Sequence, residues 1–166
     1  MLQEGYVAVE GGRIFYVVVG GGDATPLMCL HGGPGLPHDY LEPLGRLADG
    51  RQVVFYDQLG CGRSDRPGDD GLWRLDRFVD EIDAVRHRLG LERMHLLGHS
   101  WGGFLAATYA VAQSEGLRSL VLASPLISVD RWLQDATSLR STLPAAQAAG
   151  RIELGGPHMV TYTSKP

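Results

Sequence analysis

Gly98-His99-Ser100-Trp101-Gly102 is the stretch of this 166-residue chain that decides its fold. An apolar segment from Met94 to Leu97 leads into it, and an alanine-rich helical segment from about Gly103 to Gln113 leads out. In such a strand–turn–helix setting a serine takes a strained backbone conformation that projects its hydroxyl above the sheet. The flanking glycines leave room for that backbone. Because the chain has 23 glycines, the pattern also arises by chance, and a glycine-rich turn that binds phosphate or nothing is the alternative.

A second glycine-rich motif, His31-Gly32-Gly33-Pro34-Gly35, follows the apolar run from Leu27 to Leu30. A loop in this place can direct backbone N–H groups at an oxyanion, and its glycines let a substrate carbonyl approach. Taken alone, the motif is equally well an ordinary turn. Its pairing with the Ser100 turn favours the catalytic interpretation, in which the following helix also points its N-terminus at the developing anion.

The third motif is the loop Asp57-Gln58-Leu59-Gly60-Cys61-Gly62-Arg63-Ser64-Asp65, which follows an apolar run. Its residues either buttress the site or form a purely structural loop, and the structural interpretation is the stronger of the two. Asp57 and Asp65 precede Ser100, whereas the acid of a catalytic triad follows the serine in this kind of fold. Both are therefore poor candidates for that acid.

The remaining pattern predicts an α/β architecture. Tyr6 to Val9 and Ile14 to Val19, on either side of Gly11-Gly12, predict an antiparallel hairpin. Short apolar runs separated by helical segments predict parallel strands joined by right-handed crossovers. These runs are Leu27–Leu30, Val53–Tyr56, Met94–Leu97 and Leu120–Leu122.

One crossover helix is predicted between Leu75 and Leu89, where apolar residues recur at helical spacing, and Gly90 is its expected C-cap. Charged residues fill the positions between the apolar ones. We expect these residues, Arg77 and Glu81 among them, on the solvent-facing side.

Composition excludes several classes of function. The net charge of −4 favours neither nucleic acid nor an acidic membrane surface as a partner. No apolar run reaches the roughly 18 residues of a membrane helix, and the N-terminus lacks a signal-peptide layout, so we expect a cytoplasmic protein. Cys29 and Cys61 are expected as free thiols, with a disulfide between them as the alternative. No metal-ligand spacing occurs, and no metal or cofactor is expected.

The three motifs together resemble those of the proline iminopeptidase family. HGGPG at 31–35, DQLGCGRSD at 57–65 and GHSWGG at 98–103 occur in the family's order and spacing. The family consists of α/β-hydrolase aminopeptidases, and tricorn-interacting aminopeptidases and some amino-acid amidases are similar to it. The resemblance runs from about residue 1 to residue 147.

The resemblance implies an α/β-hydrolase fold and a serine hydrolase that cleaves an N-terminal residue from small peptides or amides through an acyl-enzyme. It implies Ser100 as the nucleophile and the backbone N–H groups of Gly33 and Trp101 as the oxyanion hole. The family's usual basic residue in the DQxG turn is replaced here by Leu59, which bears on substrate preference.

The base and the acid of a triad are not identified. His158 is the sole histidine after Ser100, and a solvent-exposed histidine is the preferred interpretation for it. The later acids, Asp130, Asp135 and Glu153, are not separated from His158 by the strands that the family places between acid and histidine. The chain by itself is therefore expected to lack most of the parent enzyme's activity.

The order of elements predicts the N-terminal part of an α/β-hydrolase core over 1–128, ending after a sixth strand, and the start of a helical cap over 129–147. A helix is expected from Asp130 to Leu143. Residues 148–166 are expected to form an irregular tail of foreign composition, because Lys165 is the one lysine beside fourteen arginines.

Three functions stay open at this point: a serine aminopeptidase, an esterase, amidase or acyltransferase on the same scaffold, and a binding protein that keeps the serine turn without a base. An aspartate nucleophile, as in dehalogenases and epoxide hydrolases, is excluded by Ser100. The oligomeric state is not predicted.

Overall fold

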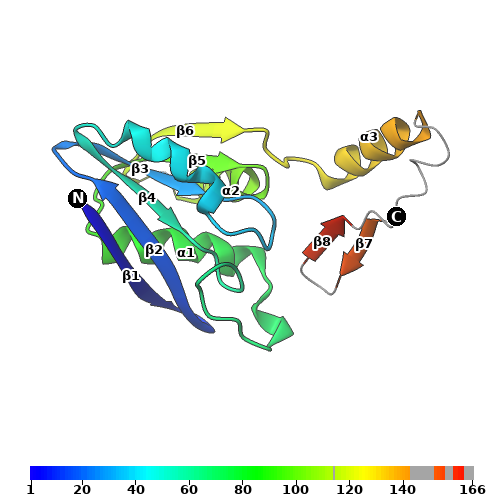
Figure 1. Ribbon diagram of the computed structural model, residues 1–166, viewed down its shortest axis with the longest axis horizontal. Helices are drawn as coiled ribbons and strands as arrows, with labels where there is room; N and C mark the ends of the chain where they lie inside the picture. The colour runs from blue at the N-terminus through cyan, green and yellow to red at the C-terminus, as the bar shows by residue number, and fades with distance from the viewer. Residues whose placement is uncertain (114, 143–151, 156–158, 163–166) are drawn as a thin grey trace. The chain divides into compact units, whose positions relative to one another are not determined.

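The computed structural model describes residues 1–113, 115–142, 152–155 and 159–162, and a six-stranded sheet forms the centre of its first 125 residues (Figure 1). The strand order is β1-β2-β4-β3-β5-β6. The β1–β2 and β2–β4 pairs are antiparallel, and β3 pairs in parallel with both β4 and β5, as β5 does with β6. The strands are β1 Leu2–Val9, β2 Gly12–Gly20, β3 Ala24–Leu30, β4 Arg51–Tyr56, β5 Met94–His99 and β6 Leu117–Ala123. The predicted hairpin and parallel sheet are confirmed.

Helices cover both faces of this sheet. On one face, α1 (Leu75–Arg88) and α2 (Trp101–Ala112) share a large core with β2, β3, β4 and β5. On the other face, the 3-10 helix η1 (Asp39–Leu47) buries Leu41 against a smaller core. A second 3-10 helix, η2, spans Asp70–Leu72. The sequence pattern predicts neither of these 3-10 helices.

The two cores take alternate residues of the same strands. In β3, Met28 and Leu30 belong to the larger core, whereas Leu27 and Cys29 belong to the smaller one. In β4 the larger core contains Val54 and the smaller core Phe55. This is the two-residue repeat of a strand that is buried on both faces. Both cysteines, Cys29 and Cys61, are buried free thiols, as expected.

The predicted helices are found with shifted ends. α1 matches the predicted segment, and Gly90 takes a φ of +65° immediately after it. α2 begins at Trp101 rather than near Gly103, because Ser100 itself is the N-cap residue and no loop intervenes. No helix among the described residues is long and apolar enough to cross a membrane.

The prediction that α1 exposes all its charged residues is wrong for two of them. The side chains of Arg77 and Glu81 are 1% and 0% exposed, and a 2.6 Å salt bridge joins them. Glu81 also accepts a hydrogen bond from the Leu59 N–H at 3.1 Å, so the pair lies beneath the loop that follows β4. Burial raises the pKa of Glu81 to about 7, although the Arg77 guanidinium opposes this rise.

The chain divides into two compact units, Met1–Pro125 and Leu126–Pro166. In the second unit, α3 (Val129–Ser141) matches the predicted helix, and the Ser128 hydroxyl caps it by accepting the Arg131 N–H at 3.2 Å. The expected irregular tail contains an antiparallel pair, β7 (Ile152–Gly155) and β8 (Met159–Tyr162). Neither strand is a fully apolar run, which is the signal that predicts the buried strands of the six-stranded sheet.

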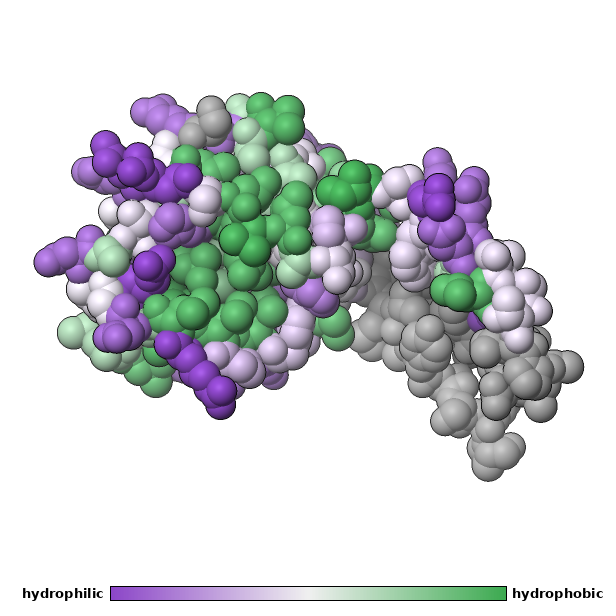
Figure 2. Space-filling view, turned by 90° about the horizontal axis from the view of Figure 1, so that it is seen from above, coloured by the Kyte–Doolittle hydropathy of each residue, from purple (hydrophilic) through white to green (hydrophobic). Residues whose placement is uncertain are grey.

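Strand β6 forms one edge of the sheet and exposes apolar side chains there. Val121 and Leu122 are 45% and 38% exposed. Figure 2, seen from the side on which β6 lies in Figure 1, shows an extended apolar surface on this unit. An apolar edge strand with unpaired N–H and C=O groups favours association with another strand.

We therefore predict that the 166-residue chain associates with itself through β6. A Val121→Lys substitution should shift the chain toward the monomer, because a charge on an edge strand opposes strand pairing. The control is Val111→Lys on α2, which adds the same charge at a side chain that is 91% exposed. Light scattering after size exclusion measures the effect. Equal association of both variants would contradict a role for β6.

Candidate active site

Ser100 lies at the turn between β5 and α2 with φ +54° and ψ −117°. Such a backbone conformation costs a residue other than glycine about 1–3 kcal/mol. Hydrogen bonds hold it on both sides. The Ser100 N–H donates to the Ala123 carbonyl of β6 at 3.0 Å, and the Ser100 carbonyl accepts from the N–H groups of Gly103 and Phe104 at 3.0 and 3.2 Å. The turn is thus fixed between the end of β6 and the first turn of α2.

The glycines around Ser100 are required by close backbone contacts. A Cβ on Gly98 would overlap the Gly102 carbonyl, and a Cβ on Gly102 would overlap the carbonyls of Leu30 and His31. A Cβ on Gly103 would lie 2.8 Å from the Cβ of Pro125. The crowding expected from the G-x-S-x-G pattern is therefore present.

The loop His31–Gly35 lies directly beside this turn. A Cβ on Gly32 would come within 3.1 Å of the Ser100 Cβ. The His31 ring is buried, and both of its nitrogens are in hydrogen bonds: Nδ1 with the Gly32 carbonyl at 2.8 Å, and Nε2 with the Gln58 N–H at 2.9 Å. A carbonyl can only accept and an amide N–H can only donate. His31 is therefore neutral, with its proton on Nδ1.

This arrangement sets the direction of the Gly33 N–H. The carbonyl of Gly32 and the N–H of Gly33 belong to one trans peptide unit and point in opposite directions. Because the His31 ring holds the carbonyl, the Gly33 N–H points away from that ring. On the other side of the site, Trp101 is the first residue of α2. The N–H groups in the first turn of a helix have no carbonyl partner within the helix, so the Trp101 N–H has none within α2.

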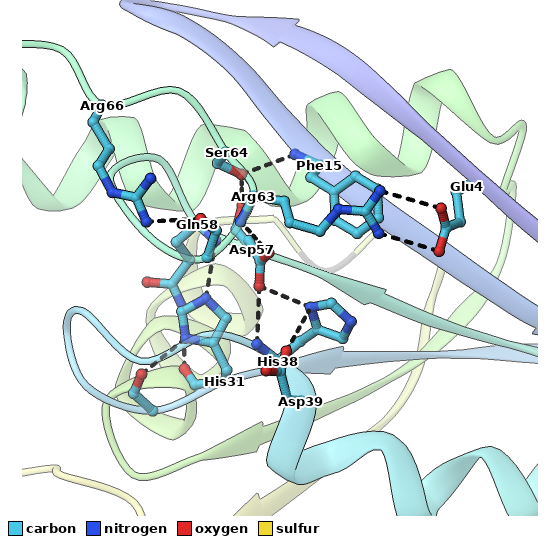
Figure 3. Close-up of polar contacts among 12 residues, drawn as sticks. Glu4, Phe15, His31, His38, Asp39, Asp57, Gln58, Arg63, Ser64 and Arg66 are labelled. Carbon is cyan, nitrogen blue, oxygen red and sulfur yellow. Dashed lines mark hydrogen bonds and ion pairs between the residues drawn. The ribbon is translucent and has the colours of Figure 1, made fainter.

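Gln58 connects the loop after β4 to both other motifs, and Figure 3 shows its contacts with His31. Its side-chain amide donates to the His31 carbonyl at 3.0 Å, and its Oε1 accepts from the Trp101 indole N–H at 2.9 Å. These two contacts favour the alternative interpretation, in which the loop after β4 buttresses the site, over a purely structural one. The three loops meet because β4, β3 and β5 are parallel neighbours, and this adjacency could have identified Gln58 from the sequence.

Asp57 connects its own loop to His38 through hydrogen bonds. It is buried, and its carboxylate accepts hydrogen bonds from the His38 N–H at 2.9 Å, the His38 ring at 2.8 Å and the Arg63 N–H at 2.8 Å (Figure 3). Burial opposes ionisation, but these hydrogen bonds outweigh it and lower the pKa of Asp57. These contacts occupy both carboxylate oxygens, in keeping with the expectation that Asp57 is not a triad acid.

Among the described residues, no histidine hydrogen-bonds the Ser100 hydroxyl. The rings of His31, His38 and His99 bond other groups. Asp135 pairs with Arg131 at 3.0 Å on the surface of α3, where Asp130 is also exposed. Glu153 belongs to β7, and His158 lies outside the described residues. No base or acid of a triad is therefore assigned.

Comparison with known proteins matches residues 25–150 to the family described as alpha/beta hydrolase fold. A proline iminopeptidase of Heyndrickxia coagulans is 41% identical over 99% of this chain and 64% of its own length. One of Lactiplantibacillus plantarum is 46% identical over 84% of this chain and 51% of its own. The crystal structure of proline iminopeptidase from Mycobacterium smegmatis superimposes with a TM-score of 0.80 at 40% identity, covering 89% of this chain and 52% of that one. The chain thus spans between about half and two thirds of these relatives.

The protonation state of His31 predicts how stability depends on pH. Burial lowers the pKa of His31, and protonation would break its bond with the Gln58 N–H. Below about pH 6.5 the unfolded chain binds a proton that folded His31 does not, so the free energy of unfolding falls as the pH falls. Urea unfolding between pH 7.5 and 5 should show this slope in the wild type and less of it in a His31→Gln variant.

The control for this prediction is His87→Gln, since His87 is exposed at the end of α1. Glu81, whose pKa is raised to about 7, contributes a slope of the opposite sign. Its contribution is common to all three proteins and cancels in their differences. Identical pH slopes for the wild type and His31→Gln would contradict the prediction.

Proposed function

Because this chain belongs to the alpha/beta hydrolase fold family, we propose that it carries the nucleophile of a serine hydrolase, with Ser100 in that role. The observation that supports the proposal most directly is the left-handed backbone of Ser100 at a strand-to-helix turn. A side chain there projects from the end of the sheet, and strained residues of this kind cluster at active sites.

The proposed reaction is acyl transfer followed by hydrolysis. The Ser100 oxygen attacks the carbonyl carbon of the scissile amide, and its proton passes to a base. The N–H groups of Gly33 and Trp101 donate to the oxyanion, and the N-terminus of α2 stabilises the same charge. Collapse of this intermediate expels the amine, which takes the proton, and leaves an ester on Ser100. Water then hydrolyses the ester and releases the acid.

We propose that the substrate is a small peptide or amide with a free N-terminus, from which proline or another small apolar residue is removed. This part rests on the relatives, which are named proline iminopeptidases. Leu59 takes the place of the family's usual basic residue, and its side chain is 1% exposed, so this position presents no charge to a substrate. A role in cytoplasmic proteolysis is part of the same proposal.

The first test concerns the nucleophile. The complete protein should react with a fluorophosphonate probe at Ser100, and Ser100→Ala should abolish labelling and lower turnover by about 10⁶-fold. The matched control is Ser124→Ala, since Ser100 and Ser124 are the two described residues other than glycine that have a positive φ. Labelling of Ser100→Ala at the wild-type rate would refute the assignment.

The second test concerns the substrate. An aminopeptidase binds the free amine of its substrate, so an N-acetylated aminoacyl arylamide should react at least about 100-fold more slowly than the free one. The ratio of kcat/KM for the two compounds measures this. Equal values would favour an esterase or amidase of the same fold.

A further inference from the structure

The Tyr40 side chain joins two segments that are far apart in the sequence. Tyr40 lies in the first turn of η1, and its hydroxyl oxygen accepts the Gly32 N–H at 2.6 Å. The same hydroxyl lies 2.9 Å from Nδ1 of His99, and the two rings meet edge to face with centroids 5.4 Å apart. One side chain therefore contacts both the loop after β3 and the turn after β5.

The direction of these hydrogen bonds follows from their chemistry. The Gly32 amide can only donate, so the Tyr40 oxygen accepts from it. The Tyr40 proton is then free to be donated to Nδ1 of a neutral His99 ring, whose own proton is on Nε2. Each bond in such a chain polarises the next. The chain runs from Gly32 through Tyr40 to His99.

Both ends of this chain adjoin the proposed oxyanion donors. Gly32 precedes Gly33, and His99 lies two residues before Trp101. At Gly32, Tyr40 holds the N–H and His31 holds the carbonyl, so both peptide groups of this glycine are fixed by side chains. Neither of these side chains engages the next amide, the N–H of Gly33.

We propose that Tyr40 is a positioning residue that sets the separation of the two oxyanion donors, Gly33 and Trp101. This inference rests on the proposed function of Ser100. Glycines give the loop after β3 little stiffness of its own, with φ of +130° at Gly33 and +108° at Gly35. The hydrogen bonds of Tyr40 to Gly32 and His99 restrict this loop relative to the turn after β5. The two oxyanion donors need this rigidity, because they must be aligned before negative charge develops on the substrate oxygen.

The test is Tyr40→Phe in the complete protein, with turnover of an aminoacyl arylamide as the readout. The ring remains, so packing is preserved and only the hydroxyl is lost. A lost donor costs about 10²–10³-fold in kcat, and a displaced one costs less, so we expect a fall of roughly 10- to 100-fold with KM within about twofold. The matched control is Tyr6→Phe, because Tyr6 is 41% exposed and Tyr40 42%.

A second pair of variants separates positioning from general structure. His99→Asn can still accept the Tyr40 proton and should retain most of kcat, whereas His99→Leu cannot and should match Tyr40→Phe. The double variant Tyr40→Phe/His99→Leu should be no slower than either single variant, because both remove the same chain of bonds. Thermal unfolding midpoints within a few degrees of the wild type would show that the fold is intact.

Three outcomes would overturn the inference: a Tyr40→Phe variant as active as Tyr6→Phe, a loss confined to KM, or fully additive losses in the double variant. Failure of the proposed function gives a different result, because Ser100→Ala would then keep the wild-type turnover. The two failures are therefore distinguishable in one set of assays.

Discussion

The left-handed backbone at Ser100 is the constraint on which the rest of this structure depends. It lets β5 pass into α2 without a loop, so the serine and the first amides of the helix lie at one point. The conformation persists because three backbone hydrogen bonds and the packing of β5 against its neighbours hold it. The same tightness excludes side chains at Gly98 and Gly102. The strain at Ser100, the glycines on either side of it and the geometry of the site therefore all follow from the tight turn between β5 and α2.

The order of the parallel strands explains how three separate motifs form one site. β3 lies between β4 and β5, so the loop that follows it is flanked by the loops that follow both neighbours. Gln58 reaches this central loop from one side, and the turn at Ser100 adjoins it on the other. Gln58 and Tyr40 each contact two of these segments, and their hydrogen bonds restrict a glycine-rich loop that would otherwise be flexible. The buried Arg77–Glu81 pair holds the loop after β4, because Glu81 accepts the Leu59 N–H.

Much of the fold could be predicted from the sequence, because apolar runs indicate buried strands and glycines indicate turns or close backbone contacts. The strand that leads to Ser100 and the helix after it are examples of such local signals. The sequence pattern places Arg77 and Glu81 on the wrong side of α1, because a helical repeat cannot reveal that two ionisable side chains pair in the core. Tyr40 acts through partners far along the chain, and no local pattern encodes such contacts. Gln58 could be found only by placing the loops after neighbouring parallel strands side by side, because its own partners are equally distant.

The division of the core into two parts has a consequence for how this chain can vary in length. Neighbouring residues of β3, such as Met28 and Cys29, belong to different cores on opposite faces of the sheet. An insertion or deletion of one residue within β3 would exchange the two sets of side chains and shift the following glycine loop by one position. The connection between η1 and β4 lies at the surface, where an added residue disturbs no such alternation. We therefore expect changes in length at such surface connections rather than within β3, because packing on both faces of the sheet fixes the spacing from β3 to its loop, independently of catalysis.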